Sequence, residues 1–360
     1  MKKSLIALAA LAASGAVMAQ SSVTLYGVLD TGVSYFKGDD SVYGLTKTGG
    51  NTNSRLGFRG VEDLGNGLKA TFNLEAGINV DDGTGYMARD ARDTGFQFRR
   101  ISTVGLAGNF GEVRLGRELT ASYNAVSRYD VFGDTGLGGS LAWKRAYASR
   151  TENAVSYYSP VFSGFKAGVN YGFGEKKSAS NNRYLGLGFF YDNGPLSLGL
   201  GYDYANRGHN ADGINATGAA VNTPNLTTWQ LGGAYNFGVA KVMAFYKQTK
   251  EEAPGANTSD KFKTFGLGVS APVGAAGEVR AAYNNYRISP NAGSTQKANQ
   301  LSLGYVHNLS KRTALYGTYA YIKNDKKNNA GLQLSGAMTG AGLSNSGAQH
   351  GLQAGIRHAF

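Results

Sequence analysis

The feature of this sequence that most constrains its fold is a series of short segments joined by connections that are alternately short and long. Each segment spans roughly 8 to 13 residues and is bounded by Gly, Asn, Asp or Pro. Helical periodicity is almost absent after the first twenty or so residues. We therefore predict sixteen strands, at 21–36, 54–63, 67–78, 96–107, 111–118, 153–159, 164–173, 182–192, 196–207, 227–237, 240–251, 262–271, 277–289, 299–308, 313–324 and 349–360.

Several of these segments place apolar and polar residues on opposite faces. In 227–237, Trp229 and Leu231 alternate with Gln230, and the last segment alternates in the same way. A period of two residues with one apolar face fits a half-buried soluble sheet or the wall of a barrel in lipid. The alternation is less clear in 240–251 and 313–324, and the facing of these two strands stays open.

The connections decide between a soluble sheet and a membrane barrel. Tight links follow the even-numbered strands, whereas the odd-numbered strands are followed by longer polar loops, at 37–53, 79–95, 119–152, 174–181, 208–226, 252–261, 290–298 and 325–348. In an antiparallel meander this pattern puts every long loop at the same end, which is the plan of outer-membrane barrels. All six prolines lie in predicted connections, so none is expected to remove a hydrogen bond from a strand. We predict a transmembrane barrel of sixteen antiparallel strands.

The amino-terminal residues predict export. Two lysines and a run of apolar and small residues lead to Val17 and Ala19, the small residues of a signal-peptide cleavage site. We expect a signal peptide at 1–19 and a single barrel domain at 20–360. The apolar run falls short of the roughly 20 residues that a membrane-spanning helix needs. The chain has no Cys, so a disulfide scaffold is excluded.

The third long loop, 119–152, is the longest. Loops of this length are functional or disordered, and aromatic residues such as Tyr129 and Trp143 argue for order. Because a barrel of sixteen strands leaves an aqueous channel, we expect this loop to fold into the lumen and narrow the pore. Asp130 and Asp134 then face the opposite wall.

That wall carries basic residues on its inward positions. Alternation directs Arg55 and Glu75 into the lumen, and Arg150, just before its strand, is a further candidate. Arg99 and Arg100 are adjacent, so only one of them can face inward without a bulge. A cluster of permanently charged guanidinium groups in a narrow passage favours anions. The alternative is that these residues are solvated and do not control selectivity.

Other function classes find little support. None of the four His lies beside a nucleophile motif, and no His, Cys and carboxylate spacing indicates a metal site, so we expect neither an enzyme nor a cofactor. The net charge is +12, yet no dense basic run occurs, which argues against a nucleic-acid partner. A solute-specific channel with tyrosines along the lumen and a barrel adhesin remain alternatives.

Long stretches of the chain resemble the trimeric general porins of β-proteobacteria. They extend over nearly all of the predicted barrel and include SSVTLYGVLDTGVSYF, SRLGFRGVEDLGNGLKA, GNFGEVRLGRE, LSLGYVHNLSKRTALYG and GIRHAF. The resemblance implies a homotrimer of sixteen-stranded barrels in the outer membrane, surrounded by its lipids and lipopolysaccharide. It also implies general diffusion of small hydrophilic solutes and anions past a constricting third loop.

The same resemblance implies the residues of the constriction. The relatives that this sequence is most similar to are anion-selective and carry an arginine cluster, opposite an acidic position on the loop. Matched motif by motif, these positions fall on Arg55, Arg100, Arg150, Glu75 and Asp130. The segments 79–95 and 133–149 depart from the family pattern, so the choice between Arg99 and Arg100 and the identity of the loop acids stay open.

Overall fold

The computed structural model describes residues 22–86, 95–143, 149–174, 183–206, 225–252, 258–325, 330–334 and 347–360, and the predicted signal peptide lies outside them. Most of the described residues belong to strands. The strands are β1 (Ser22–Lys37), β2 (Ser41–Leu45), β3 (Arg55–Gly65), β4 (Leu68–Ile78), β5 (Gly85–Tyr86), β6 (Ile101–Gly108), β7 (Gly111–Leu119), β8 (Arg150–Tyr158), β9 (Phe165–Gly172), β10 (Tyr184–Asn193), β11 (Leu196–Ala205), β12 (Asn225–Asn236), β13 (Lys241–Glu252), β14 (Ser259–Val273), β15 (Gly277–Ser289), β16 (Gln296–Asn308), β17 (Thr313–Asn324) and β18 (Ala348–Ala359).

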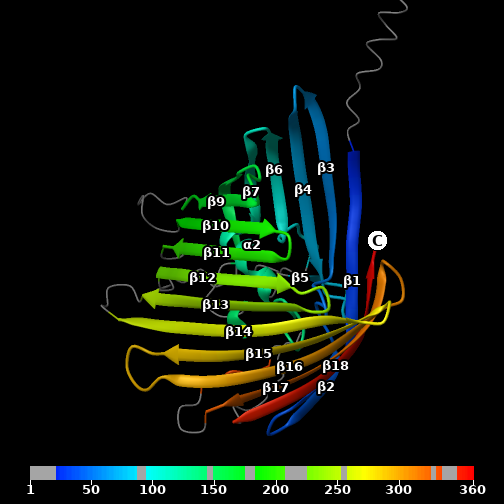
Figure 1. Cartoon of the computed structure of the whole chain (residues 1–360), viewed down its shortest axis with the longest axis vertical. Coiled ribbons are helices and arrows are strands. Elements are labelled where there is room, and N and C mark those ends of the chain that lie inside the picture. Colours follow the sequence, from blue (N-terminus) through cyan, green and yellow to red (C-terminus); the bar gives the residue numbers. More distant parts are fainter. Residues whose placement is uncertain are drawn as a thin grey trace, which may run out of the picture.

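The described strands form one antiparallel sheet that closes on itself. Each long strand pairs with its neighbours in the sequence, and β1 pairs with β18 from Val28 to Lys37, which removes the free edges. The amino-terminal half of β1 pairs with β3. In Figure 1 the strands β9 to β15 run at a steep angle to β3, β4 and β6, as the tilted strands on different sides of a barrel do.

The sixteen predicted strands are all present. The two further strands of the sheet, β2 and β5, are short and lie within the long connections that follow β1 and β4. Several starting points differ from the prediction by a few residues, and two of these differences lie beside predicted site residues. Strand β6 begins at Ile101 rather than at residue 96, because its ladder with β4 begins where Ile101 meets Glu75. Strand β8 begins at Arg150 rather than at residue 153, because Arg150 pairs with Leu119 of β7.

Alternation along the strands gives the sheet two different faces. The apolar face carries large exposed side chains, among them Leu200, Trp229, Leu231, Phe265, Leu301 and Leu352. The polar face carries buried side chains, among them Thr228, Gln230, Asn284, Gln300, Ser302 and Gln353. The predicted facing of 227–237 and of the last strand is confirmed. The structure also gives the facing of 240–251 and 313–324, which the sequence left open, because Lys247 of β13 and Thr318 of β17 are buried on the polar face.

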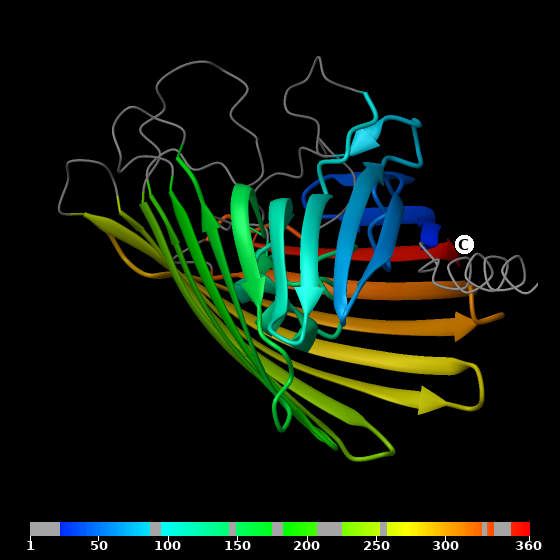
Figure 2. The ribbon, with the colours of Figure 1, turned by 90° about the horizontal axis from the view of Figure 1, so that it is seen from above.

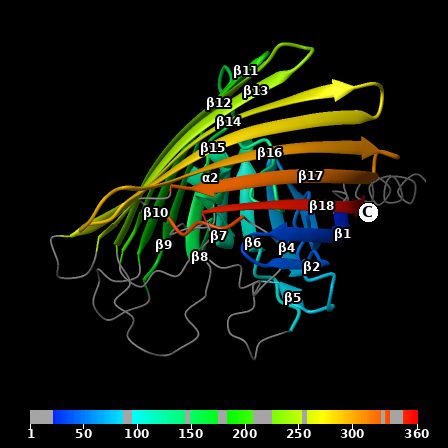
Figure 3. The same ribbon diagram turned by 90° about the horizontal axis from the view of Figure 1, so that it is seen from below.

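Helical structure in the described chain is confined to the connection between β7 and β8. It comprises the helix α2 (Ala121–Val126) and the 3-10 turns η1 (Ser127–Tyr129) and η2 (Leu141–Trp143). None of the helices within the described ranges has the length and apolar character to cross a membrane. Figures 2 and 3 show α2 close to the strands rather than out beyond their ends.

Candidate functional site

The connection between β7 and β8 packs against the polar face of the sheet. We call its described part, residues 120–143, the covering segment. Its helix α2 begins at Thr120, whose hydroxyl accepts a hydrogen bond from the Tyr123 amide at 3.1 Å. The amide of Ala121 donates to Asn170 of β9 at 2.5 Å. The hydroxyl of Ser122 donates to Asp203 of β11 at 2.6 Å. The start of the covering segment is therefore bonded to two strands.

Side chains of four more strands hold the rest of the covering segment by its backbone. Lys247 of β13 donates to the carbonyl of Ala142 at 2.6 Å. Tyr286 of β15 accepts from the amide of Leu141 at 3.0 Å. Gln300 of β16 donates to the carbonyl of Gly139 at 3.2 Å, and Gln353 of β18 accepts from the amide of Leu137 at 3.2 Å. These bonds satisfy backbone groups that burial would otherwise leave unpaired.

Glycines of the wall make room for this packing. A Cβ atom on Gly188 of β10 would lie 2.2 Å from the carbonyl oxygen of Ala121, and one on Gly199 of β11 would lie 2.0 Å from that of Ala125. Such distances are impossible, so only glycine lets the helix approach the sheet this closely. The high glycine content of the chain is thus partly explained by contact between the covering segment and the wall.

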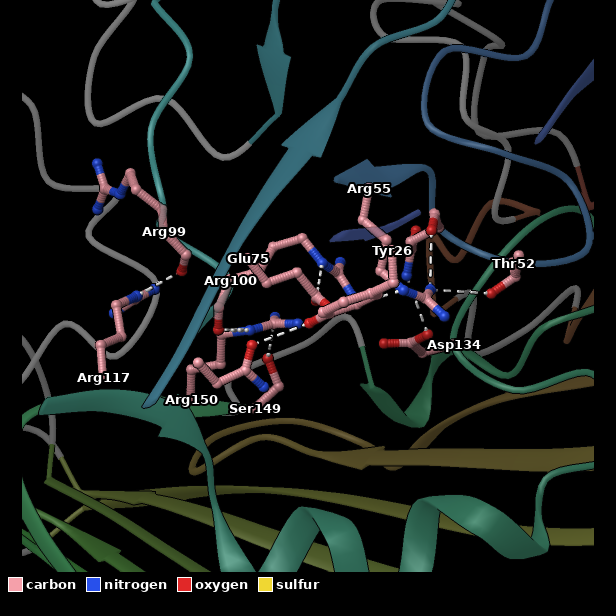
Figure 4. A network of polar contacts seen from close by, with 12 residues as sticks. Tyr26, Thr52, Arg55, Glu75, Arg99, Arg100, Arg117, Asp134, Ser149 and Arg150 are labelled. Atoms are coloured by element: carbon pink, nitrogen blue, oxygen red, sulfur yellow. Dashed lines mark hydrogen bonds and ion pairs between the residues drawn. The ribbon is translucent and has the colours of Figure 1, made fainter. Parts of the chain in front are cut away.

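Across from the covering segment, charged side chains converge on Glu75 of β4 (Figure 4). The Arg100 Nε atom lies 2.6 Å from one carboxylate oxygen of Glu75. The Arg55 Nε atom lies 3.5 Å from the other oxygen, to which the hydroxyl of Tyr26 also donates, at 3.0 Å. Strands β1, β3 and β4 and the residue directly before β6 supply these side chains, which we call the arginine cluster together with Arg150.

Arg150 joins the cluster through the backbone. Its Nε atom donates to the carbonyl oxygen of Arg100 at 3.0 Å, and it is 7% exposed. The directions of the two side chains show whether Arg99 or Arg100 belongs to the cluster. Arg100 reaches Glu75, whereas the side chain of Arg99 points away from it in Figure 4. Two guanidinium groups therefore share the Glu75 carboxylate and a third adjoins them, and the Nη1 atom of Arg100 is buried without a hydrogen-bond partner.

The two acidic residues proposed to face the arginines occupy different places. Asp130 is buried inside the covering segment, where it accepts hydrogen bonds from the Trp143 indole at 2.9 Å and from the Ser140 and Phe132 amides at 3.1 Å. Burial raises the pKa of Asp130 to about 7, although these three donors favour its charged form. All three of these donors belong to the covering segment rather than to the arginine cluster. Asp134 lies beside the cluster instead (Figure 4), 3.4 Å from the amide nitrogen of the Asn53 side chain.

A turn before β3 links the cluster to the wall. The carboxylate of Asp30, on the polar face of β1, accepts the backbone amides of Gly50, Asn51 and Thr52 at 2.8–3.0 Å. The hydroxyl of Tyr316 donates to the same carboxylate at 2.7 Å. The Nη1 atom of Arg55 in turn donates to the carbonyl oxygen of residue 53 at 3.0 Å. Asp30 therefore holds the turn against which Arg55 rests.

A family of known proteins matches most of the chain. The model of the Gram-negative porins matches residues 5–327. This chain belongs to the Gram-negative porins. The porin is 47% identical to outer membrane porin protein 32 of Delftia acidovorans over the full length of both chains. It is 34% identical to an outer membrane porin protein of Bordetella pertussis, with 90% of this chain and 95% of that one covered.

Solved structures agree with this assignment. The anion-selective porin from Comamonas acidovorans superposes with a TM-score of 0.78 and 41% identity, over 95% of this chain and 100% of that one. A loop-deletion mutant of OmpT from Vibrio cholerae, at 18% identity and a TM-score of 0.71 over 94% of this chain and 99% of that one, shares the fold. The chain is thus an outer-membrane porin with a closed barrel of sixteen antiparallel strands.

Sequence patterns alone could not identify some residues of this site. Asp30 was not singled out, although its position on the polar face of the first strand could have suggested a buried role. The place of Asp130 could not be foreseen, because its partners depend on how residues 131–143 fold. Groups of three or more His, Cys, Asp or Glu suited to a metal ion do not occur in the part of the chain that the structure describes.

Proposed function

We propose that this porin is a general diffusion channel for small hydrophilic solutes and that it prefers anions. The observation that carries the preference is the arginine cluster, in which Arg55 and Arg100 both contact Glu75 and Arg150 bonds to the carbonyl oxygen of Arg100. An excess of fixed positive charge attracts anions and repels cations in a narrow passage with low-dielectric walls. The anion selectivity named for the Comamonas relative supports the same proposal.

In this proposal the covering segment lies in the lumen and narrows the channel. Its support is the series of bonds to the polar face of the wall, which in a porin lines the aqueous interior. Asp134 supplies negative charge beside Arg55, and Asp130 keeps the covering segment folded. The charges on the two sides of the passage create a transverse field across it.

The proposal extends to the assembly and its surroundings. We infer a homotrimer in the outer membrane, in contact with its lipids and lipopolysaccharide, after removal of residues 1–19. A solved structure of the related OmpT from Vibrio cholerae is a trimer form, which supports the oligomer. The family consists of channel proteins, and we infer no catalytic activity and no cofactor for this chain.

The test is the zero-current potential of the purified protein in a planar bilayer under a KCl gradient. A stable pore whose potential has the sign of anion preference is expected. A cation-selective pore would support the proposed channel but contradict the proposed role of the arginine cluster in selectivity. Swelling of liposomes in a series of sugars tests general diffusion, because a single privileged sugar would indicate a solute-specific channel instead. Loop-dependent binding to cells without conductance would favour an adhesin.

A further inference from the structure

A cavity lies between the wall and the covering segment, on the short-turn side of the arginine cluster. Its volume is about 370 Å³, and most of its lining comes from β1, β3, β4, β6 and β7, which are neighbours in the sheet (Figure 1). Asn124 of α2 lines it from the covering segment. Arg59, a further lining residue, is four positions beyond Arg55, about 13 Å along β3 towards its short turn to β4. We call this space the vestibule cavity.

Two carboxylates and one guanidinium group line the β7 side of the vestibule cavity. The Arg114 guanidinium lies 2.6 Å from an oxygen of Glu112 and 2.9 Å from an oxygen of Glu118. The Glu118 side chain is 5% exposed and that of Glu112 is 24% exposed, so Glu112 is the more accessible acid. We call these three residues the acidic triad. Because two negative charges face one positive charge, the acidic triad has one negative charge in excess.

The opposite imbalance lies on β3. The Arg59 side chain is exposed on the polar face, where its guanidinium lies 5.2 Å from the centre of the Tyr26 ring. Within the described parts of the chain, neither Arg59 nor Lys166 of β9 has a carboxylate at ion-pair distance. The ammonium of Lys166 packs over the ring of Tyr158 at 5.3 Å. The vestibule cavity is thus bordered by a cation and an acidic group that do not pair with each other.

Polar groups lie between these two charges. Arg59 pairs in register with Asn73 of β4, and Asn73 pairs with Thr103 of β6. All three residues line the vestibule cavity. The wall between Arg59 and the acidic triad therefore carries an amide and a hydroxyl group, which suit a peptide group.

A glycine lets the acidic triad extend towards β3. The Thr71 hydroxyl of β4 donates to Glu112 of β7 at 3.1 Å, across the intervening strand β6. Between them lies Gly105, where a Cβ atom would be 2.9 Å from the Thr71 hydroxyl and 3.2 Å from the Cγ atom of Arg114. A side chain at this position would therefore displace both neighbours. Glycine keeps the Glu112 carboxylate close to β4, the strand next to Arg59.

We propose that the vestibule cavity binds zwitterionic solutes of the size of a dipeptide. The carboxylate of the solute pairs with Arg59, and its ammonium pairs with Glu112, whose oxygens accept more than one hydrogen bond each. A volume of about 370 Å³ is within the range of small-molecule sites. A solute with a single charge satisfies only one of the two groups. The site rests on the proposed function, because the solute must enter the channel to reach it.

The test measures peptide binding from the interruptions that a peptide causes in the single-channel current of the full protein in a planar bilayer. At pH 7 glycylglycine carries both charges, whereas glycylglycinamide carries only the positive charge. One ion pair in a partly exposed site changes binding by about fivefold. Arg59→Gln is therefore expected to weaken glycylglycine binding by about fivefold and to leave glycylglycinamide within about twofold of its wild-type binding. Glu112→Gln is expected to weaken both peptides by about fivefold.

Matched controls remove the same charges elsewhere on the barrel. Arg280 and Glu278 form an ion pair on β15, a strand that pairs only with β14 and β16 in the described sheet. Arg280→Gln and Glu278→Gln are each expected to bind glycylglycine within about twofold of the wild type. A loss in the controls equal to that in Arg59→Gln and Glu112→Gln would overturn the site, because the effect would then follow the charge of the whole channel.

Two further results would overturn the proposal. The first is unchanged glycylglycine binding in both Arg59→Gln and Glu112→Gln. The second is an equal loss of both peptides in Arg59→Gln, which would give Arg59 a role in the fold rather than in binding a carboxylate. The zero-current potential of the wild type separates this proposal from the proposed function. An anion-selective pore whose current glycylglycine does not interrupt contradicts only the site, whereas a protein without a pore contradicts the proposed function itself.

Discussion

The polar face of the barrel has two contrasting regions. Along β9 to β18 the covering segment is held by amides, hydroxyls and one lysine, and apolar residues such as Phe245 and Ile322 are buried under the connections. Along β1, β3, β4 and β8 the same face carries Asp30, Arg55 and Glu75, which bond mainly to one another and to a turn. The covered region is a protein core, whereas the arginine region is a set of fixed charges.

This difference teaches that one strand pattern serves two purposes. In the covered region the inward side chains satisfy backbone groups and exclude water, so their loss affects stability. In the arginine region the inward side chains set the local electrostatic potential, so their loss affects selectivity. Substitutions in the two regions are therefore expected to produce separable effects.

The largest effect on stability is expected from Tyr286→Ala in the covered region. Tyr286 is fully buried, accepts the Leu141 amide and donates to Gln300. Removal of a large buried aromatic side chain is expected to lower the free energy of unfolding by about 3–5 kcal/mol, measured by urea titration of the vesicle-inserted protein. Tyr286→Phe, the control, loses only the hydrogen bonds and costs about 1 kcal/mol. An alanine variant as stable as the wild type would show that the covered region is not a core.

A smaller effect, on both properties, is expected from Asp30→Asn. The carboxylate holds three backbone amides of the turn beside Arg55, and charged hydrogen bonds of this kind contribute about 1.5–3 kcal/mol. We expect a loss of stability in this range together with a reduced anion preference, because Arg55 loses its support. Asp40→Asn, in the exposed bend before β2, is the control. A variant with lowered stability but wild-type selectivity would confine Asp30 to a structural role.

The next effect concerns pH in the covered region. The pKa of Asp130 is raised by burial to about 7, with the carboxylate of Asp134 adding to the shift. Between pH 7 and the pKa that this carboxyl has in the unfolded chain, the folded state therefore binds more protons than the unfolded state. Stability therefore rises as pH falls through this range and is lost as pH increases to 7. The difference between pH 8.5 and 5.5 is about 2 kcal/mol by linkage.

Hydrogen exchange at the amides of Ser140 and Phe132 measures this pH effect directly. Protection relative to the intrinsic exchange rate is expected to be greater at pH 5.5 than at pH 8.5. In Asp130→Asn the pH dependence is expected to disappear. An equal pH dependence in that variant would assign the effect to another group.

The contrast between the two regions also explains how much could be predicted from the sequence. The sixteen strands, their closure and the placement of Arg55 and Glu75 followed from alternation and connection lengths. The facing of β13 and β17 could not be read, because residues such as Phe245 and Ile322 are apolar on the inward face. Those residues are apolar because other parts of the chain cover them, and that contact joins residues far apart in sequence.

The loop acids show the same limit. Asp130 and Asp134 are four positions apart and identical in type, yet one is buried against Trp143 and the other lies beside Asn53. No local pattern distinguishes them, because their environments are made by the fold of the whole covering segment. The adjacent Arg99 and Arg100 were separable only once the ladder of β6 with β4 was known.

The most direct test of the central claim, that the arginine region sets the ionic preference, is the zero-current potential of Arg55→Glu, Arg100→Glu and Arg150→Glu in a KCl gradient. One charge near a passing ion is worth about 1 kcal/mol, so each variant is expected to shift the anion-to-cation permeability ratio towards cations by roughly fivefold or more. Glu75→Gln should shift it in the opposite direction. Lys241→Glu, the same charge change outside the cluster, should leave it unchanged. Wild-type potentials in all three arginine variants, with barrels folded normally, would contradict the account.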